Sequence, residues 1–237
     1  MRVGCCGFPV RREEYYSKFD IVEVQSTFYN LPRPSTAIRW RAEAPAGFDY
    51  ILKAWQPITH PSDSPTYTKT RVEIPQSKAG SYGFFKPTDE VHEAWERTRE
   101  TARILDSRMI LFQCPPRFEE NADNLLNMRT FFENVERGRL KLLWEPRGRW
   151  NEDTIKSLCR DLNLIHCVDP FCDNQVHGGI AYYRLHGKGG YGYQYTDSDL
   201  TELLGMCPKD KDSYVMFNNM SMLEDALRFK FLCRGKQ

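Results

Sequence analysis

The chain has 237 residues, of which 41% are hydrophobic, so it can bury one large core and we expect a single domain over residues 1–237. Lys and Arg number 33 and Asp and Glu 32, which excludes a strong overall attraction to nucleic acid or to an anionic membrane. No stretch approaches the roughly 20 apolar residues of a membrane span, and the N-terminus lacks a secretion signal, so we expect a cytoplasmic protein without membrane contact.

Eight short apolar segments recur along the chain, and each is closed by a turn signal. In chain order they cover residues 2–6, 21–27, 50–55, 109–114, 141–147, 164–169, 181–187 and 214–219. Amphipathic helices are predicted between several of them, over residues 88–106, 121–137, 151–162 and 221–233. The helix after the first strand and the connection from the sixth strand to the seventh look short.

Strands that alternate with helices predict a parallel sheet. Two α/β arrangements compete for such a pattern: a doubly wound open sheet and a closed (β/α)8 TIM barrel. No GxGxxG motif follows the first strand, and a count of eight strands favours closure. The sequence therefore predicts a TIM barrel.

Polar residues stand at the end of nearly every predicted strand, where a fully buried parallel strand would not hold them. They are Glu23, Gln25, Lys53, Gln113, Glu145, Arg147, Asp169, Arg184, His186, Asn218 and Asn219. Because side chains alternate along a strand, Glu23, Gln25 and Thr27 are predicted to share one face. By the same rule Glu145 lies beside Arg147 and Arg184 beside His186. We expect these faces to look into the barrel, while the apolar faces pack under helices.

Two interpretations of these polar ends stay open. Inward charges can form a purely structural lattice of ion pairs, and for Gln25, Arg147 or Asn218 alone that interpretation is as good as a functional one. Asp169 precedes Pro170, which is typical of a turn. Polar residues at seven successive strand ends are difficult to explain by packing, however. The pattern thus favours a site at the carboxyl ends of the strands, where barrel enzymes act.

The eight cysteines lack the paired CxxC spacing of zinc or iron–sulfur sites. The adjacent Cys5 and Cys6 must point to opposite faces of a strand, so they are not expected to chelate one ion together. Most of the cysteines are predicted to be buried thiols.

Several of these segments are similar to a known family. The runs GCCGF, VEVQSTFYNLP, LKAWQPITH, FFKPTDEV, LFQCPPRF, WEPRGRW, YRLHGKGGY and MFNN resemble, in order and along the whole chain, the YecE-like family, called domain of unknown function 72. The resemblance implies a TIM barrel and no established reaction. It also implies recurrent polar positions at Glu23, Lys53, Gln113, Glu145, Arg147, Arg184, His186 and Asn218. The chain departs from the family pattern at Gln25, where Asn is typical, and at Cys5 and Cys6, where small or hydroxyl residues are common.

The surroundings of the strand ends point to an anionic ligand. Lys53, Arg147, Arg184 and Lys188 supply positive charge, and glycines at 187, 189 and 190 follow the seventh strand, where barrels often bind phosphate. Aromatic residues suited to stacking lie close by, Tyr29 and Tyr191 among them. The predicted substrate-binding set is Gln25, Tyr29, Gln113, Arg147, Arg184, Gly187, Lys188, Tyr191 and Asn218. The long segment over residues 56–86 is a candidate lid, or it holds minor secondary structure.

Three classes of function follow from these residues. One is metal-assisted hydrolysis of a phosphoester, in which Glu23, Glu145, Asp169 and His186 bind a divalent Mg or Mn ion and Lys53 or Arg184 stabilises phosphate charge. Another needs no metal: Glu23 and Glu145 act as an acid and base pair, while Lys53 holds an anion or forms a Schiff base. The predicted catalytic set is Glu23, Lys53, Glu145 and His186.

The third class is a protein that binds a nucleotide or a nucleic-acid end without turning it over. The nearly neutral net charge argues against extended contact with nucleic acid, so this partner is possible and not favoured. An enzyme that acts on an anionic small molecule or phosphoester ranks first.

Overall fold

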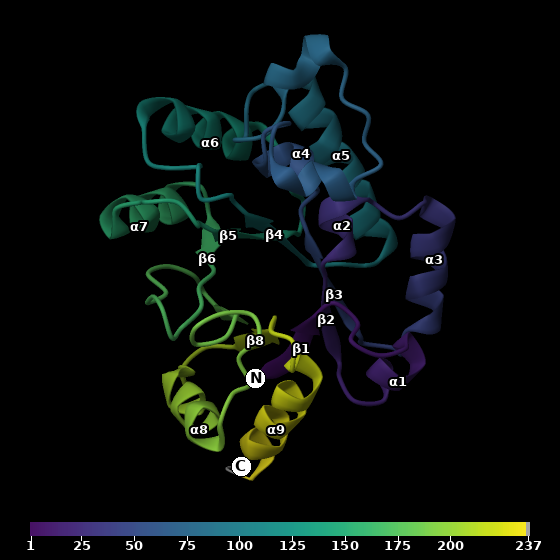
Figure 1. Cartoon of the computed structure of the whole chain (residues 1–237), viewed down its shortest axis with the longest axis vertical. Coiled ribbons are helices and arrows are strands. Elements are labelled where there is room, and N and C mark those ends of the chain that lie inside the picture. The colour runs from purple at the N-terminus through teal and green to yellow at the C-terminus, as the bar shows by residue number, and fades with distance from the viewer. Residues whose placement is uncertain (236–237) are drawn as a thin grey trace.

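The computed structural model describes residues 1–235, and its centre is an eight-stranded parallel sheet (Figure 1). The strands are β1 (Arg2–Cys6), β2 (Ile21–Val24), β3 (Asp49–Lys53), β4 (Met109–Gln113), β5 (Lys141–Glu145), β6 (Leu164–His166), β7 (Ala181–Leu185) and β8 (Ser213–Phe217). They pair in chain order from β1 to β6, and β1 also pairs with β8, which pairs with β7. A parallel bridge between Val168 and Tyr183 joins the two remaining edges. The predicted TIM barrel is confirmed, as a nearly closed one.

Helices surround this barrel and follow most of its strands. They are α1 (Arg12–Tyr16), α2 (Ser26–Tyr29), α3 (Pro34–Glu43), α4 (Gln56–Thr59), α5 (Asp89–Ile104), α6 (Ala122–Asn134), α7 (Glu152–Asp161), α8 (Asp197–Met206) and α9 (Met222–Arg234). The four helices that the periodicity predicted are α5, α6, α7 and α9. Thr88, Asn121 and Asn151 cap the first three of these, because their side chains accept hydrogen bonds from backbone N–H groups of the first turn.

The two connections predicted to be short are short. The helix after β1 has five residues, and no helix lies between β6 and β7 in the described part of the chain. Helices α3 and α8 were not singled out from the sequence. Helix α8 carries a capping box, in which Thr196 and Asp199 exchange side-chain and backbone hydrogen bonds.

Apolar residues form two separate clusters, one on each side of the sheet. The larger contains Val22, Val24 and Phe112 from the strands together with helix residues such as Trp95, so it lies between the strands and the helices. The smaller takes residues from all eight strands or their immediate ends and none from a helix, so it fills the barrel interior. Side chains therefore alternate between interior and outer layer, as the strand period requires.

The first predicted strand ends at Cys6, as β1 does, and the other seven predicted strands end one to three residues too late. The clearest case is β2, which ends at Val24, because Gln25 takes a helical backbone conformation with φ −71° and ψ −30° and begins α2. Thr27 is therefore not on the strand face of Glu23, and that prediction is wrong. Its hydroxyl donates to the carbonyls of Val24 and Lys53, at 2.7 Å each, and so ties the helix to the ends of β2 and β3.

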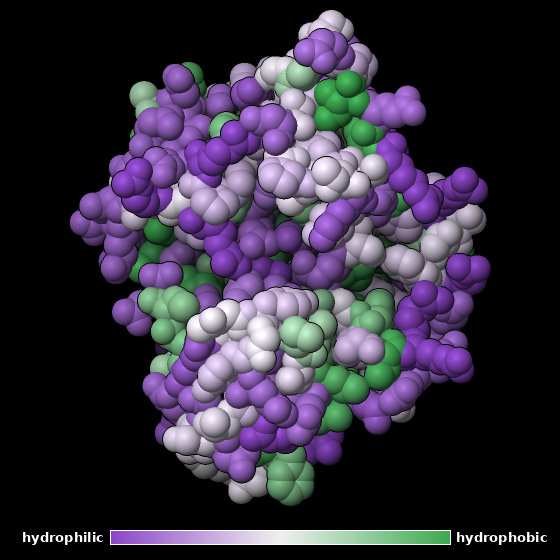
Figure 2. Space-filling view, in the orientation of Figure 1, coloured by the Kyte–Doolittle hydropathy of each residue, from purple (hydrophilic) through white to green (hydrophobic). Residues whose placement is uncertain are grey.

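The segment over residues 56–86 contains short helices rather than one extended loop. Helix α4 is followed by two 3-10 helices, η1 (Pro65–Lys69) and η2 (Gln76–Ser81). Figure 2 shows the outside of the molecule, where hydrophilic side chains border a hollow near the centre of the face and hydrophobic groups are scattered. Within residues 1–235 no helix has both the length and the apolar character needed to span a membrane.

Candidate active site

A buried arginine lies between two buried carboxylates inside the barrel. Glu23, Glu145 and Arg184 are within two residues of the ends of β2, β5 and β7, and their strand neighbours on both sides belong mainly to the outer cluster. The Arg184 guanidinium donates to both Glu23 oxygens at 2.8 to 3.1 Å and to Glu145 Oε2 at 2.5 Å. Arg184 and Glu23 are completely buried and Glu145 nearly so. The three side chains form one ionic unit, here called the carboxylate–arginine triad.

Further polar groups complete the hydrogen bonding of Glu23. The Tyr182 hydroxyl donates to Glu23 Oε2 at 2.7 Å, and the Gln25 amide donates to Oε1. The Cys6 thiol lies 3.8 Å from the Arg184 guanidinium. Each Glu23 oxygen thus has more than one donor, so the hydrogen-bonding capacity of this buried side chain is satisfied.

Arg147 and His186 connect the triad to the outside. Arg147 Nε is 2.7 Å from Glu145 Oε1, and another nitrogen of the same guanidinium lies 2.5 Å from His186 Nε2. His186 Nε2 is also 3.3 Å from Arg184. Both arginines can only donate, so Nε2 is the acceptor and Nδ1 carries the proton, 3.6 Å from Asp169 Oδ2. Arg147 is partly exposed, and so is His186.

Lys53, at the end of β3, is a buried cation outside the triad. Its side chain is 8% exposed, and Nζ lies 4.1 Å from the centre of the Phe28 ring. The Phe28 ring also makes an edge contact with the His60 ring, with 4.8 Å between their centres, and the Thr59 hydroxyl is 2.8 Å from His60 Nδ1. Within residues 1–235, no carboxylate oxygen comes within 4.0 Å of Lys53 Nζ. Lys53 is therefore held by an aromatic ring instead of an ion pair.

Burial and neighbouring charges shift the pKa values of these groups in opposite directions. Burial alone would raise the pKa of Glu145, but Arg184 and Arg147 outweigh it and lower the pKa to about 2. Burial, aided by the Arg184 charge, lowers the pKa of Lys53 to about 8. Burial and the Lys53 charge lower the pKa of His60 to about 3. Glu145 is thus ionised and His60 neutral at pH 7, while Lys53 titrates close to neutrality.

Three predicted binding residues after β7 are engaged elsewhere. Lys188 Nζ is 2.6 Å from Asp199 and 2.8 Å from Glu202, so it binds helix α8. The N–H of Gly187 donates to Tyr195, and the N–H groups of residues 189 and 190 donate back to the Gly187 carbonyl. Tyr191 is 54% exposed. The structure does not bring these three residues into the triad network, and the N–H groups at 187, 189 and 190 already have partners.

The remaining predicted binding residues lie at the strand ends without joining the network. Gln113 stands opposite Glu145 in the β4–β5 register, and Asn218 follows β8, where its N–H donates to Leu185. The Tyr29 carbonyl accepts hydrogen bonds from Trp55 and Thr70. Gln113, Asn218 and Tyr29 are all partly exposed, so they are able to contact a ligand at the mouth of the barrel.

The four residues predicted to bind a metal do not fit that role. Residues 1–235 contain no group of three or more His, Cys, Asp or Glu side chains arranged to hold a metal ion. The Arg184 guanidinium stands between Glu23 and Glu145, where a cation shared by them would sit. Asp169 accepts hydrogen bonds from the N–H groups of His186 and Phe171, so it acts as a turn residue. The positive charge of Arg184 already neutralises the two carboxylates that were expected to share an Mg or Mn ion.

Sequence reasoning missed several residues of the site. Tyr182 is two positions before Arg184, so strand alternation was a sufficient signal for it. Cys6 belongs to the cysteines, most of which the sequence predicts only to be buried thiols. Phe28 follows the end of β2, but nothing in the sequence places its ring against Lys53. His60 lies seven residues beyond Lys53 in the chain. The turn into α4 brings it back towards Lys53, and the sequence pattern does not predict that approach.

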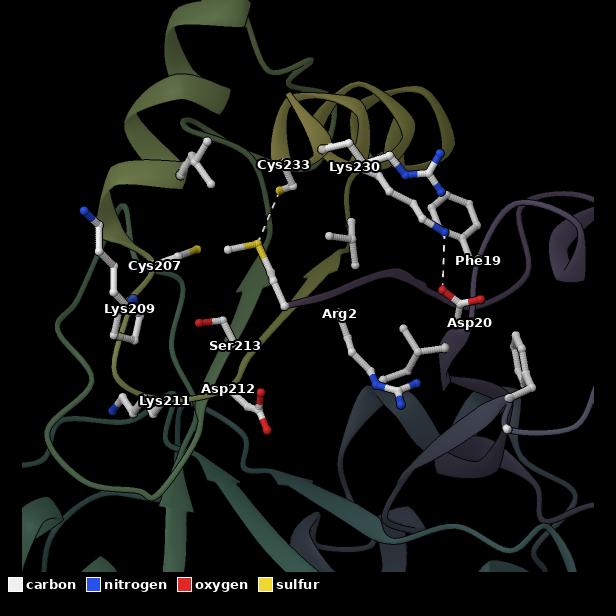
Figure 3. Close-up of a pocket in the computed structure, with 18 of the residues that line it drawn as sticks. Arg2, Phe19, Asp20, Cys207, Lys209, Lys211, Asp212, Ser213, Lys230 and Cys233 are labelled. Carbon is white, nitrogen blue, oxygen red and sulfur yellow. Dashed lines mark hydrogen bonds and ion pairs between the residues drawn. The ribbon is translucent and has the colours of Figure 1, made fainter. Parts of the chain in front are cut away.

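A wide hollow lies at the opposite end of the barrel (Figure 3). Its volume is about 1690 Å³, and it is lined by the starts of β1, β2 and β8, with Arg2 and Ser213 among the lining residues. Lys230 approaches Asp20 across it, and Cys233 lies 3.3 Å from the Met1 sulfur. It is a wide, open depression in which cations and anions are mixed. The carboxylate–arginine triad and Lys53 are not among the residues that line it.

Comparison with known proteins agrees with this architecture. The family model "Protein of unknown function DUF72" matches residues 9–233. The UPF0759 protein YunF of Bacillus subtilis (strain 168) is 25% identical, over 88% of this chain and 80% of YunF.

Solved structures give the same fold. DUF72 family proteins of Enterococcus faecalis V583 and Thermotoga maritima MSB8 each superpose with a TM-score of 0.69 at 19% identity, over 98% of this chain and 97% or 98% of theirs. Endonuclease IV of Thermus thermophilus has a TM-score of 0.52 at 12% identity, over 99% of this chain and 98% of that one, which is a likeness of fold alone. With its barrel, its strand-end residues and a family match over nearly its whole length, this chain belongs to the DUF72 family.

Proposed function

We propose that this chain is an enzyme that binds an anionic small molecule at the carboxyl ends of its strands and transforms it without a metal. The observation that carries the proposal is Lys53, a buried ammonium group without a carboxylate partner. A buried charge normally has a counterion, because removing it from water costs several kcal/mol. A negatively charged substrate would supply that counterion.

The charges near Lys53 support the same conclusion. Glu23 and Glu145 are balanced by Arg184 and Arg147, so the ammonium of Lys53 is in excess. Asp169 carries a further negative charge, but it lies beside His186 and is not among the main groups that shift the pKa of Lys53. An anion bound beside Lys53 would therefore restore neutrality, and the partly exposed Arg147 is placed to bind it from the mouth.

The triad itself fits the structural interpretation of the inward charges. It is fully buried and its hydrogen bonds are satisfied, so it holds β2, β5 and β7 in place. Lys53, Arg147 and His186 border it on the side of the strand ends. In the proposed enzyme the triad positions these residues, while the substrate contacts Lys53 and Arg147.

Phosphate esters are one class of anion that such a site would accept. Endonuclease IV shares the fold with this chain, but a likeness of fold does not transfer a substrate. The net charge of +1 favours a small phosphorylated or carboxylated compound over a nucleic acid.

Binding of inorganic phosphate and glycerol 3-phosphate, measured by calorimetry, tests this proposal. We expect Arg147→Met to weaken binding by roughly 10- to 100-fold, since a hydrogen bond to a charged group contributes about 1.5–3 kcal/mol. Arg149→Met is the matched control, because Arg149 lies in the same loop but pairs with Glu119 at the surface. Equal affinity in the two variants, or no binding by the wild type, would contradict the proposal. Turnover that disappears in EDTA would contradict its metal-free part.

A further inference from the structure

Lys53 has the surroundings of a reactive amine. Its Nζ lies over the Phe28 ring, and the residue is 8% exposed. The neighbouring imidazole of His60 is neutral, so it supplies no counterion for the lysine. Within residues 1–235, Nζ has no hydrogen-bond partner. It is not a completely buried atom, so it keeps contact with solvent. The amine is thus dry on most sides and open on one.

The nearby carboxylates cannot hold Lys53 as an ammonium ion. Glu23 and Glu145 are each bound at short distance by Arg184, and both lie more than 4.0 Å from Nζ. The Arg184 charge repels a proton on Lys53. The charged and titratable groups that face Lys53 are Arg184, Glu23, Glu145, Cys6 and His60. Burial and the Arg184 charge outweigh Glu23, Glu145 and Cys6, which raise the pKa of Lys53, and lower it to about 8. About a quarter of the amine is therefore neutral at pH 7.5, against about 0.1% for an ordinary lysine.

A site that only holds an anion does not need a neutral amine. Arginine serves that purpose better because it keeps its charge at all physiological pH values, and Arg147 already stands at the mouth. A lysine that is partly neutral, dry and close to a cation is typical of amines that attack carbonyl groups. The surroundings of Lys53 therefore point to the class of substrate.

We propose that the substrate of this site is an anionic aldehyde or ketone, and that Lys53 Nζ forms an iminium ion with its carbonyl carbon. This inference rests on the proposed function, because the anionic group of the substrate would be bound by Arg147. The neutral amine donates its lone pair to the carbonyl carbon, and the carbonyl π electrons move to oxygen, which takes a proton from water. The nitrogen passes one proton to the same oxygen, which then leaves as water, so that the C=N bond of the iminium ion replaces C=O, one hydroxide ion remains in solution and no oxidant is consumed.

The iminium ion would then lower the barrier to removing a proton from the adjacent carbon. Solvent that reaches the open side of Lys53 would accept that proton, because Arg184 and Arg147 hold the pKa of Glu145 at about 2 and make it a weak base. Isomerisation proceeds through this proton removal, and in carbon–carbon cleavage the iminium ion accepts the electron pair of the bond that breaks. The class of reaction is therefore an isomerase or lyase reaction, in which water finally releases the product from Lys53.

Reductive trapping tests this inference. The protein is incubated with glyceraldehyde 3-phosphate or glyoxylate and sodium borohydride, and the modified lysine is identified by peptide mass spectrometry. We expect Lys53 to be modified at least tenfold faster than the exposed Lys156 at pH 7.5, with a rate that rises through a midpoint near pH 8. A rate at Lys53 no greater than at Lys156, or a midpoint above pH 10, would overturn the inference.

Two variants separate this inference from the proposed function. Lys53→Arg keeps the positive charge but removes the nucleophile, so it should bind inorganic phosphate and form no adduct at position 53, whereas Lys156→Met should trap as the wild type does. Phosphate binding by a wild type that never traps at Lys53 overturns the iminium alone. Absence of phosphate binding overturns the proposed function. The wild-type experiment decides the question even where Lys53→Arg does not fold.

Discussion

Replacing Arg184 should lower the free energy of unfolding, because two buried carboxylates would lose the cation that they share. The pKa of Glu145 is about 2 in the folded protein against an ordinary value of 4.5. At 1.36 kcal/mol for each tenfold change, its cation neighbours stabilise the ionised form by about 3 kcal/mol. Arg184 is the largest of these neighbours and also the partner of Glu23. Breaking a buried ion pair typically costs 3–5 kcal/mol, so we expect Arg184→Met to lower the free energy of unfolding by about that amount at pH 7.

The pH dependence of the same variant gives a sharper test. In the wild type the pKa of Glu145 is depressed on folding, so its contribution is complete above about pH 4.5 and is lost as the pH falls towards 2. Without Arg184, burial and the Glu23 charge should raise the pKa of Glu145 above its ordinary value. Protonation would then favour the folded state, so the stability of Arg184→Met relative to the wild type should rise between pH 7 and pH 5, while both lose stability there because His60 is kept neutral by folding.

Urea unfolding followed by tryptophan fluorescence at pH 7, 6 and 5 measures both effects. Arg103→Met is the matched control, because Arg103 pairs with Glu100 on the exposed face of α5 and its loss should leave the midpoint almost unchanged. A loss of less than 1 kcal/mol in Arg184→Met, or a pH dependence parallel to that of the wild type, would refute the reasoning about the triad.

Two further predictions concern the segment after β7. Gly187→Ala should lower the free energy of unfolding by about 1–3 kcal/mol, because φ is +92° and a Cβ would meet the Gly190 carbonyl at 2.2 Å. Gly192→Ala should not lower it, because a Cβ there meets nothing within 4 Å. Equal urea midpoints in these two variants would contradict this account. Asp199→Ala should cost about 2–3 kcal/mol and speed proteolysis of residues 187–196, because its carboxylate accepts hydrogen bonds that cap α8 and hold this segment. Asp197→Ala, which loses one exposed ion pair, should be cut at the wild-type rate.

The alternation of polar and apolar residues was enough to predict the barrel and to predict that the polar residues at its strand ends face inward. Glu23, Glu145 and Arg184 each stand between outer-core neighbours, and a period of two places such residues inside without knowledge of the fold. The strand limits were less predictable. Gln25 suits a strand as well as a helix start, and hydrogen bonds from Thr27 to the ends of two strands decide in favour of the helix.

The partners of these residues could not be predicted. The sequence grouped Glu23, Glu145, Asp169 and His186 as metal ligands by residue type. The folded chain instead inserts Arg184 between the two glutamates and ties Asp169 to backbone N–H groups. Charges of either sign at strand ends look equally suited to a metal site or to an ion-pair lattice, because the sequence carries no distances.

The sequence by itself determined that polar side chains from most strands converge at one end of a barrel, because local periodicity fixes which face each residue takes. Only the tertiary structure decided which charges neutralise one another. Residues 23, 145 and 184 are far apart in the chain and meet because strand register and barrel closure place β2, β5 and β7 around one axis. That closure pairs two carboxylates with Arg184 and leaves Lys53 without a counterion, which is the feature on which the proposed chemistry depends.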